Sequence, residues 1–94
     1  MMMTLANTAQ LMLDYNYKTR FFAEYAQTKI RYEKLKHLCD EIEAAKMLPE
    51  PTLEPPHDCP LELLRRQQHA MGEYLHCLEL RAVIERVDLD MMEA

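Results

Sequence analysis

The sequence predicts an all-α protein, an antiparallel helical hairpin of coiled-coil type with a helical extension at its N-terminus. Three observations support this prediction. Apolar residues recur at alternating steps of three and four along residues 18–47 and 60–87, the spacing of a coiled-coil seam. All five prolines lie within residues 47–60. The chain has one glycine and no Asn-Gly turn, whereas a small β protein would need several such turns.

The N-terminal segment, residues 4–18, is expected to be helical. Thr4 or Thr8 is a candidate N-cap, because a threonine hydroxyl can accept a hydrogen bond from the free amides that begin a helix. No glycine or proline interrupts the chain from here to Leu48. The segment therefore either continues into the next helix or packs as a short separate helix in a three-helix arrangement. Asn16 is the candidate position of a bend.

The first long helix is predicted over residues 18–47. Its seam consists of Phe21, Tyr25, Thr28, Tyr32, Leu35, Cys39 and Ile42. Lysine and glutamate mostly occupy the other faces, as a solvated surface requires. This pattern predicts that one apolar stripe of the helix packs against a partner helix.

Residues 48–59 form the predicted proline-rich loop. Proline lacks an amide donor and disfavours helical geometry in the residue before it, so the first helix must end near Leu48. A loop of this length can reverse the direction of the chain, which makes the two long helices antiparallel. Pro60 suits the first turn of the second helix, with Asp58 or Cys59 near its cap.

The second helix is predicted over residues 60–87, and the chain as a whole, residues 1–94, as a single domain. Its seam consists of Leu61, Leu64, Gln68, Met71, Leu75, Leu78 and Ala82. If Ile42 faces Leu64, Tyr32 meets Leu75 across the hairpin. Gly72 either permits a close approach of the helices or occupies a neutral surface position.

The second helix is apolar beyond its seam. The additional residues are Leu63, Ala70, Tyr74, Cys77, Leu80, Val83 and Ile84. A two-helix hairpin cannot cover this flank as well as its own seam. We expect the N-terminal segment and self-association, as a homo-oligomer, to cover it.

The charge is unevenly distributed and indicates the class of partner. The net charge is −5, and residues 48–94 carry most of the acidic excess. A nucleic-acid-binding domain is usually basic, so direct binding to nucleic acid is not expected. The acidic half suits a basic surface on another protein.

Cysteine and histidine usage indicates reduced thiols and no metal site. The three cysteines are an odd number, and no secretory signal or membrane span precedes them, which predicts a cytoplasmic protein. The paired ligand spacings of structural zinc are missing, so neither a metal nor another cofactor is expected. A thin hairpin also offers no shaped pocket or oxyanion hole, and we expect no catalytic residue and no enzymatic activity.

Two groups of residues are candidates for binding. Tyr15, Tyr17 and Arg20 have the composition of an interface hot spot and are predicted to bind a partner protein. Arg65 and Arg66, in the first turns of the second helix, are candidates for holding a phosphate group of a ligand. The alternative for the two arginines is that they offset Glu62 and Glu73 nearby.

Residues 63–81, LLRRQQHAMGEYLHCLELR, resemble short uncharacterised proteins of phages and prophages that were first catalogued in crAss-like phages. The residues that carry the resemblance are Leu63, Leu64, Gln67, Ala70, Met71, Tyr74, Leu78 and Arg81. The upstream piece EYAQTKIRYEKLKHLCDEIEAA is similar to the first helix of that family. The resemblance implies a phage-encoded helical hairpin with no catalytic residues and no assigned activity.

Together these features predict a small phage protein that acts by protein–protein contact in the host cytoplasm. The principal hypothesis, implied by the phage resemblance and the acidic half, is inhibition of a host defence system by blocking a basic surface on a host protein, such as a nucleic-acid-binding CRISPR effector. One alternative is an oligomeric sponge that sequesters cyclic nucleotide immune signals through Arg65 and Arg66. Another is a structural phage component.

Overall fold

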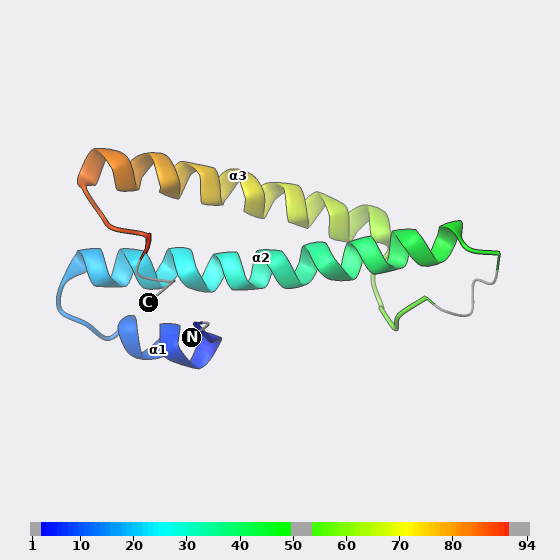
Figure 1. Ribbon diagram of the computed structural model, residues 1–94, viewed down its shortest axis with the longest axis horizontal. Helices are drawn as coiled ribbons and strands as arrows, with labels where there is room; N and C mark the ends of the chain where they lie inside the picture. Colours follow the sequence, from blue (N-terminus) through cyan, green and yellow to red (C-terminus); the bar gives the residue numbers. More distant parts are fainter. Residues whose placement is uncertain (1–2, 50–53, 91–94) are drawn as a thin grey trace.

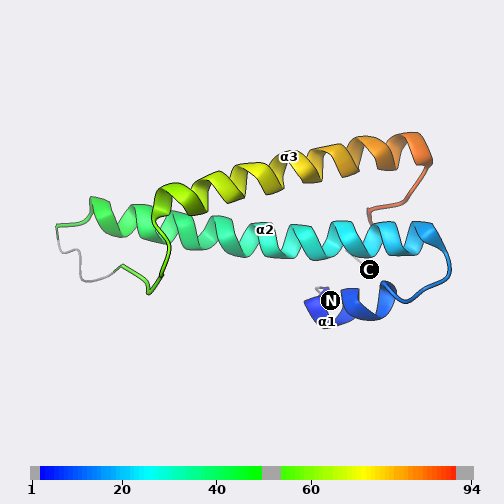
Figure 2. The same ribbon diagram turned by 180° about the vertical axis from the view of Figure 1, so that it is seen from behind.

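The computed structural model describes residues 3–49 and 54–90, which form three helices: α1 (Leu5–Leu11), α2 (Tyr17–Met47) and α3 (Leu61–Glu85). The long helices α2 and α3 run antiparallel side by side, and α1 packs on the opposite side of the first part of α2 (Figures 1 and 2). The described residues contain no strand. The predicted all-α hairpin with an N-terminal helix is therefore confirmed.

The start of the chain forms a short separate helix. Thr4 caps α1 with a capping box, in which its hydroxyl accepts from the Asn7 amide at 3.2 Å and its own amide donates to Asn7 Oδ1 at 3.0 Å. Asn16 lies at the predicted bend and caps α2, because its Oδ1 accepts from the Lys18 amide at 2.9 Å. Of the two arrangements open from the sequence, the separate helix is correct.

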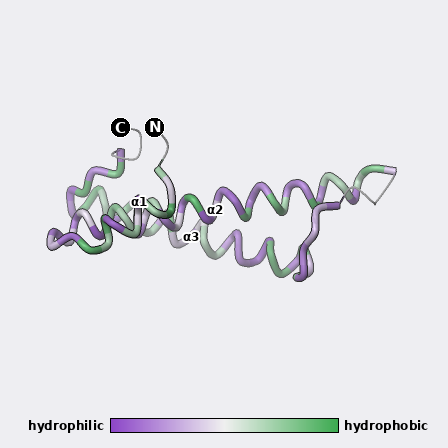
Figure 3. Tube along the Cα trace, turned by 90° about the horizontal axis from the view of Figure 1, so that it is seen from below, coloured by the Kyte–Doolittle hydropathy of each residue, from purple (hydrophilic) through white to green (hydrophobic). Residues whose placement is uncertain are grey.

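The core between α2 and α3 follows the predicted seam. Figure 3 shows hydrophobic and hydrophilic stretches alternating along both long helices, as expected for helices with one buried stripe. One cluster joins Phe21, Tyr25, Leu75, Leu78, Ala82 and Val87. Cys39, Ile42 and Gln68 are also buried. The polar seam position Gln68 is thus part of the interior, as the seam pattern predicted.

The start of α2 is buried on a second face as well. Phe22, Ala23 and Ala26 are at most 1% exposed and lie outside the cluster shared with α3. Helix α1 packs on α2 on the side away from α3 (Figure 1), and we infer that it covers these residues. Thr8 of α1 is fully buried there, and its hydroxyl donates to the Leu5 carbonyl at 2.6 Å. The first third of α2 therefore lies between two helices.

Helix α3 begins and ends differently from the prediction. Its N-cap is Pro60, with no side-chain hydrogen bond, so neither Asp58 nor Cys59 caps it. It ends at Glu85, and the left-handed backbone of its C-cap Arg86, with a φ of 59°, turns the chain back over the hairpin. The Val87 amide then donates to the Ala82 carbonyl at 2.9 Å, which places Val87 in the core.

The described part of the predicted loop is held by His57. The His57 ring bonds to the Cys59 carbonyl through Nδ1, at 2.6 Å, and pairs with Glu54 through Nε2. These contacts, chiefly the one with Glu54, raise the pKa of His57. Residues 50–53 of the predicted loop 48–59 lie outside the described residues.

The apolar flank of α3 is not covered by the N-terminal segment, so this part of the expectation is wrong. Helix α1 packs on α2, away from α3 (Figure 2). The flank residues that remain exposed include Leu63, Tyr74, Leu80, Val83 and Ile84. Among the described residues, no helix combines the length and the apolar character that a bilayer crossing requires.

Candidate functional site

The hairpin has a close contact between Tyr32 of α2 and Gly72 of α3. A Cβ atom at Gly72 would lie 3.3 Å from Cε1 of Tyr32 and 3.6 Å from its hydroxyl. Gly72 therefore permits a close approach of the helices, the first of its two predicted roles. The predicted partner of Tyr32, Leu75, lies one turn further along α3 in the cluster against which Tyr32 also packs. Glycine at this position makes α3 about 1 kcal/mol less stable as a helix than alanine would.

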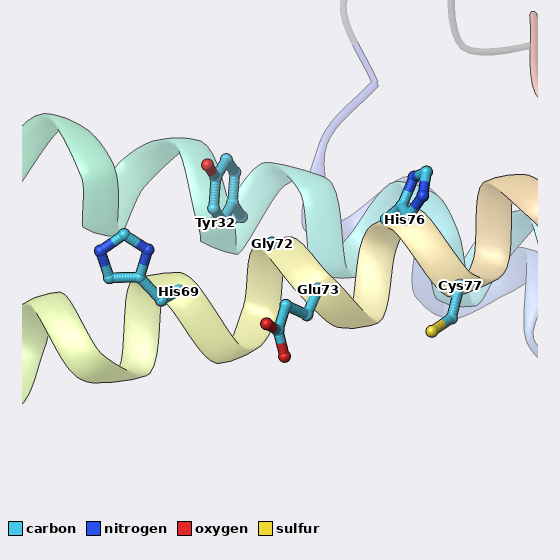
Figure 4. Close-up of a pocket in the computed structure, with 6 residues that line it drawn as sticks. All are labelled: Tyr32, His69, Gly72, Glu73, His76 and Cys77. Carbon is cyan, nitrogen blue, oxygen red and sulfur yellow. The ribbon is translucent and has the colours of Figure 1, made fainter.

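This contact forms the floor of an open, shallow depression between the two long helices, which we call the Tyr32 groove. It is lined by Tyr32, His69, Gly72, Glu73, His76 and Cys77. Figure 4 shows both histidines on the side near α2, and Glu73 and Cys77 on the side away from α2. The groove thus has an aromatic floor with ionisable groups on its edges.

Basic side chains flank the groove on α2 as well. Lys29 and Lys36 stand three residues before and four residues after Tyr32, which places them on the same helix face. His69 and His76 have the same spacing about Gly72. Because the helices are antiparallel, Lys29 lies towards the His76 end and Lys36 towards the His69 end.

The basic residues are only partly engaged with other groups. Lys29 Nζ lies 5.7 Å from the centre of the Tyr25 ring, a cation–π distance, and Lys36 Nζ pairs with Asp40 at 3.2 Å. The Lys36–Asp40 pair is at the surface, where such pairs contribute little to stability, whereas Lys29 is half-buried over the buried ring of Tyr25. Lys36 can therefore turn to an anionic ligand at small cost.

Acidic groups limit what the groove can hold. Glu79 accepts a hydrogen bond from the Tyr25 hydroxyl at 2.6 Å, and burial together with this bond raises the pKa of Tyr25. His76 Nδ1 lies 3.9 Å from the other oxygen of Glu79. Glu73 stands on the groove edge. A planar ligand with separated negative groups suits this arrangement: its ring can stack on Tyr32 and its phosphates can face the lysines.

Arg65, one of the predicted phosphate ligands, holds the two long helices together. Its Nη2 lies 3.0 Å from Asp40 Oδ1 and 3.4 Å from Glu43 Oε2 on α2. Its Nη1 donates to Oε1 of the buried Gln68 at 2.7 Å. The guanidinium is surrounded by acceptors of the protein itself, which leaves it poorly placed to bind a phosphate.

This interaction predicts how stability depends on pH. Hydrogen bonds from Arg65 and then Lys36 hold the pKa of Asp40 below its ordinary value of 3.8. A lowered pKa contributes stability that is complete above pH 3.8 and is lost as the pH falls through the lowered pKa. We expect Asp40→Asn to lower the melting temperature at pH 7 and to differ less from the wild type as the pH falls below 3.8.

Thermal unfolding followed by circular dichroism at pH 7 and near pH 3 measures this difference. Glu33→Gln, which removes an exposed carboxylate of the same helix, is the matched control and should change the melting temperature little at either pH. If Asp40→Asn lowered the melting temperature equally at pH 7 and near pH 3, the stabilising role of the ionised Asp40 carboxylate would be contradicted.

Arg66 lies apart from Arg65. Consecutive residues of a helix are about 100° apart, so Arg65 faces α2 whereas Arg66 is exposed. The structure therefore does not bring the two predicted phosphate ligands together. Arg65 does offset acidic residues, but these are Asp40 and Glu43 of α2 and not the predicted Glu62 and Glu73.

The predicted hot spot lies where α1 joins α2. Tyr15 is fully exposed between the helices, and Tyr17, the first residue of α2, is 47% exposed. Arg20 turns back and donates through Nη1 to the carbonyls of Asp14 and Tyr15, at 2.7 and 2.8 Å. Arg20 thus holds the link between the helices, while Tyr15 and Tyr17 remain available as a predicted partner-binding surface.

The Tyr32 groove was missed by reasoning from the sequence. The sequence pattern places Tyr32 in the seam, and the histidine spacings were weighed only for a zinc site. The signal that could have found it is that basic residues stand three positions before and four positions after both Tyr32 and Gly72. Among the described residues, no group of histidine, cysteine or acidic side chains could hold a metal ion.

Comparison with known proteins identifies the family of the hairpin. No curated protein and no solved structure matches the chain. The model of one family, Sequestin, matches residues 15–84, which begin just before α2 and end within the last turn of α3. The match includes the whole of the Tyr32 groove, leaves out α1 and covers most of the sequence. The chain belongs to the Sequestin family.

Proposed function

We propose that this protein sequesters a cyclic nucleotide immune signal of the host and so protects a phage from a defence system. The observation that carries the proposal is that the Sequestin match coincides with the hairpin that forms the Tyr32 groove. The family name denotes sequestration, and the resemblance of residues 63–81 to phage proteins supplies the biological setting. Capture in the host cytoplasm would need no chemical step.

The groove offers contacts for such a ligand. The Tyr32 ring can stack on a base, a contact that accepts any base. Lys29 and Lys36 lie about two helical turns apart, roughly 10 Å along α2, and can each approach a different phosphate. Two separated lysines favour a ligand with two or more phosphates over a mononucleotide.

Ligand capture has better support than the principal hypothesis from the sequence, the blocking of a basic surface on a CRISPR effector. The family name denotes sequestration, which fits the capture of a ligand better than the blocking of a protein surface, although the matched residues 15–84 also include the predicted hot spot. Docking of a host protein on Tyr15 and Tyr17 stays a prediction. A structural role in the virion has no support from the family.

The proposal predicts tight binding of at least one cyclic di- or trinucleotide. Titration calorimetry against a panel of these compounds measures it directly, and a ligand at 100 times its Kd should also raise the free energy of unfolding by about 2.7 kcal/mol. We expect Lys29→Ala combined with Lys36→Ala to weaken binding about tenfold or more, equivalent to about 1.4 kcal/mol.

The matched control is Lys34→Ala combined with Lys46→Ala, which removes two exposed lysines of the same helix away from Tyr32. It should bind like the wild type. Chromatography of the ligand recovered after denaturation should find it intact, because we propose capture without catalysis. Binding that is equal in the two double variants would place the ligand elsewhere, and a degraded ligand would indicate an enzyme.

A further inference from the structure

The outer face of α3 carries a second apolar stripe. Leu63, Gln67, Ala70, Tyr74, Cys77, Arg81 and Ile84 follow one another at alternating steps of four and three. This spacing repeats that of the seam but lies about a third of a turn away from it. Leu63 is 51% exposed, Tyr74 45% and Ile84 79%. Helix α1 lies on the far side of α2 and does not reach this stripe (Figure 1).

Charges on one edge of the stripe are self-complementary. Arg66 and Glu73 stand seven residues apart, so both lie on the same edge, and both are exposed. Neither forms an ion pair with another described residue. When two identical helices pack antiparallel, this edge meets the same edge of the other helix. Arg66 can then face the second copy's Glu73, and Glu73 the second copy's Arg66.

We infer that a second copy of this chain occupies the outer face of α3, in an antiparallel arrangement with these two reciprocal ion pairs. The register that aligns the charges packs Leu63 on the second copy's Tyr74 and places Gln67 beside the second copy's Ala70. A large apolar residue thus meets an aromatic ring, and a small residue makes room for a longer one. The interface is isologous, as in most homodimers.

Charge also selects this register over the nearest alternative. Sliding the copies by one heptad lengthens the overlap of the two α3 helices and covers more of the stripe. That shift, however, brings Glu73 opposite the second copy's Glu73. Like charges at such positions destabilise the pairing, whereas opposite charges set partner orientation.

The inferred pairing also completes the Tyr32 groove, a consequence that rests on the proposed function. Glu73 lines the groove and is unfavourable for an anionic ligand. In the dimer, the second copy's Arg66 lies beside Glu73, offsets its charge and adds a cation at the rim. Arg66 would thereby act on the ligand site of the other copy.

Charge reversal tests the pairing in the full-length protein without any nucleotide. Sedimentation equilibrium at low salt, where surface ion pairs are least screened, measures the dimer dissociation constant. We expect Arg66→Glu and Glu73→Arg each to weaken dimerisation about tenfold or more. The combined Arg66→Glu and Glu73→Arg variant should restore the wild-type constant, because the reciprocal pairs re-form with their signs exchanged.

Lys34→Glu and Glu33→Arg change the charge by the same amounts on the exposed face of α2 and are the matched controls. They should leave the dissociation constant unchanged. A monomeric wild type, or a combined variant no better than the single ones, would overturn the inference. Because nucleotide is left out, a dimer that obeys the charge swap but binds no cyclic nucleotide would refute the proposed function alone.

Discussion

Replacing Leu78 with alanine is expected to lower the free energy of unfolding by about 2–5 kcal/mol. Leu78 is 2% exposed and lies in the cluster that joins α2 to α3. Alanine would remove its apolar contacts and leave a cavity that the surrounding rings of Phe21 and Tyr25 can fill only in part. The total stability of a small domain is about 5–15 kcal/mol, so this loss is a large share of it.

Urea unfolding followed by circular dichroism at 222 nm measures the effect. Leu80→Ala is the matched control, since it deletes the same atoms two residues further along α3, where the side chain is 52% exposed. We expect the control to change the free energy of unfolding by less than about 0.5 kcal/mol. Similar losses in the two variants would mean that α3 does not pack on α2 through the predicted seam.

The seam could be predicted because the information is local to each helix. Alternating steps of three and four identify the buried stripe without knowledge of the partner, and Phe21, Tyr25, Leu75 and Leu78 are buried as expected. The proline-rich loop made the reversal of the chain predictable. Asn16 marked the boundary between α1 and α2 because its side chain caps a helix well and propagates one poorly.

The packing of α1 was harder to predict, because it depends on a second buried face of α2. Phe22, Ala23 and Ala26 extend the apolar residues beyond one seam, but only at the start of the helix. The broader apolar flank of α3 suggested the wrong surface for the N-terminal segment. That flank remains exposed, which is why we consider a second copy for it.

The groove and the roles of the arginines depend on contacts between helices and could not be read from one helix alone. A difference of one turn in register decides whether Gly72 or Leu75 lies against Tyr32, and helical spacing does not fix that register. Arg65 and Arg66 are neighbours in sequence, but α2 presents Asp40 and Glu43 to only one of them.

The Sequestin match covers the hairpin and leaves out α1. We therefore expect the proposed binding to depend on the hairpin, and α1 to contribute to stability alone. The match begins at Tyr15, after α1 has ended, and covers α2 and nearly all of α3. In this chain the start of α2 is nonetheless buried against α1. We therefore expect changes on that face to alter stability and to leave binding at the Tyr32 groove unaffected in the folded molecules.

Phe22→Ala tests this separation and should lower the free energy of unfolding by about 3–5 kcal/mol. Phe22 is 1% exposed, and its ring is among the largest fully buried side chains. Its removal opens a cavity on the face where α1 packs, so hydrogen exchange of the α1 amides should accelerate more than that of α3. Chemical unfolding measures the first effect, and exchange followed by mass spectrometry measures the second.

Tyr15→Ala is the matched control for Phe22→Ala, because it removes an aromatic ring that is fully exposed just before α2. It should change the free energy of unfolding by less than about 0.5 kcal/mol. Since Tyr15 also belongs to the predicted partner-binding surface, a loss of host-protein binding at unchanged stability would support that prediction. A mild effect of Phe22→Ala, comparable to that of Tyr15→Ala, would show instead that α1 contributes little to the fold and that α2 and α3 are stable without it.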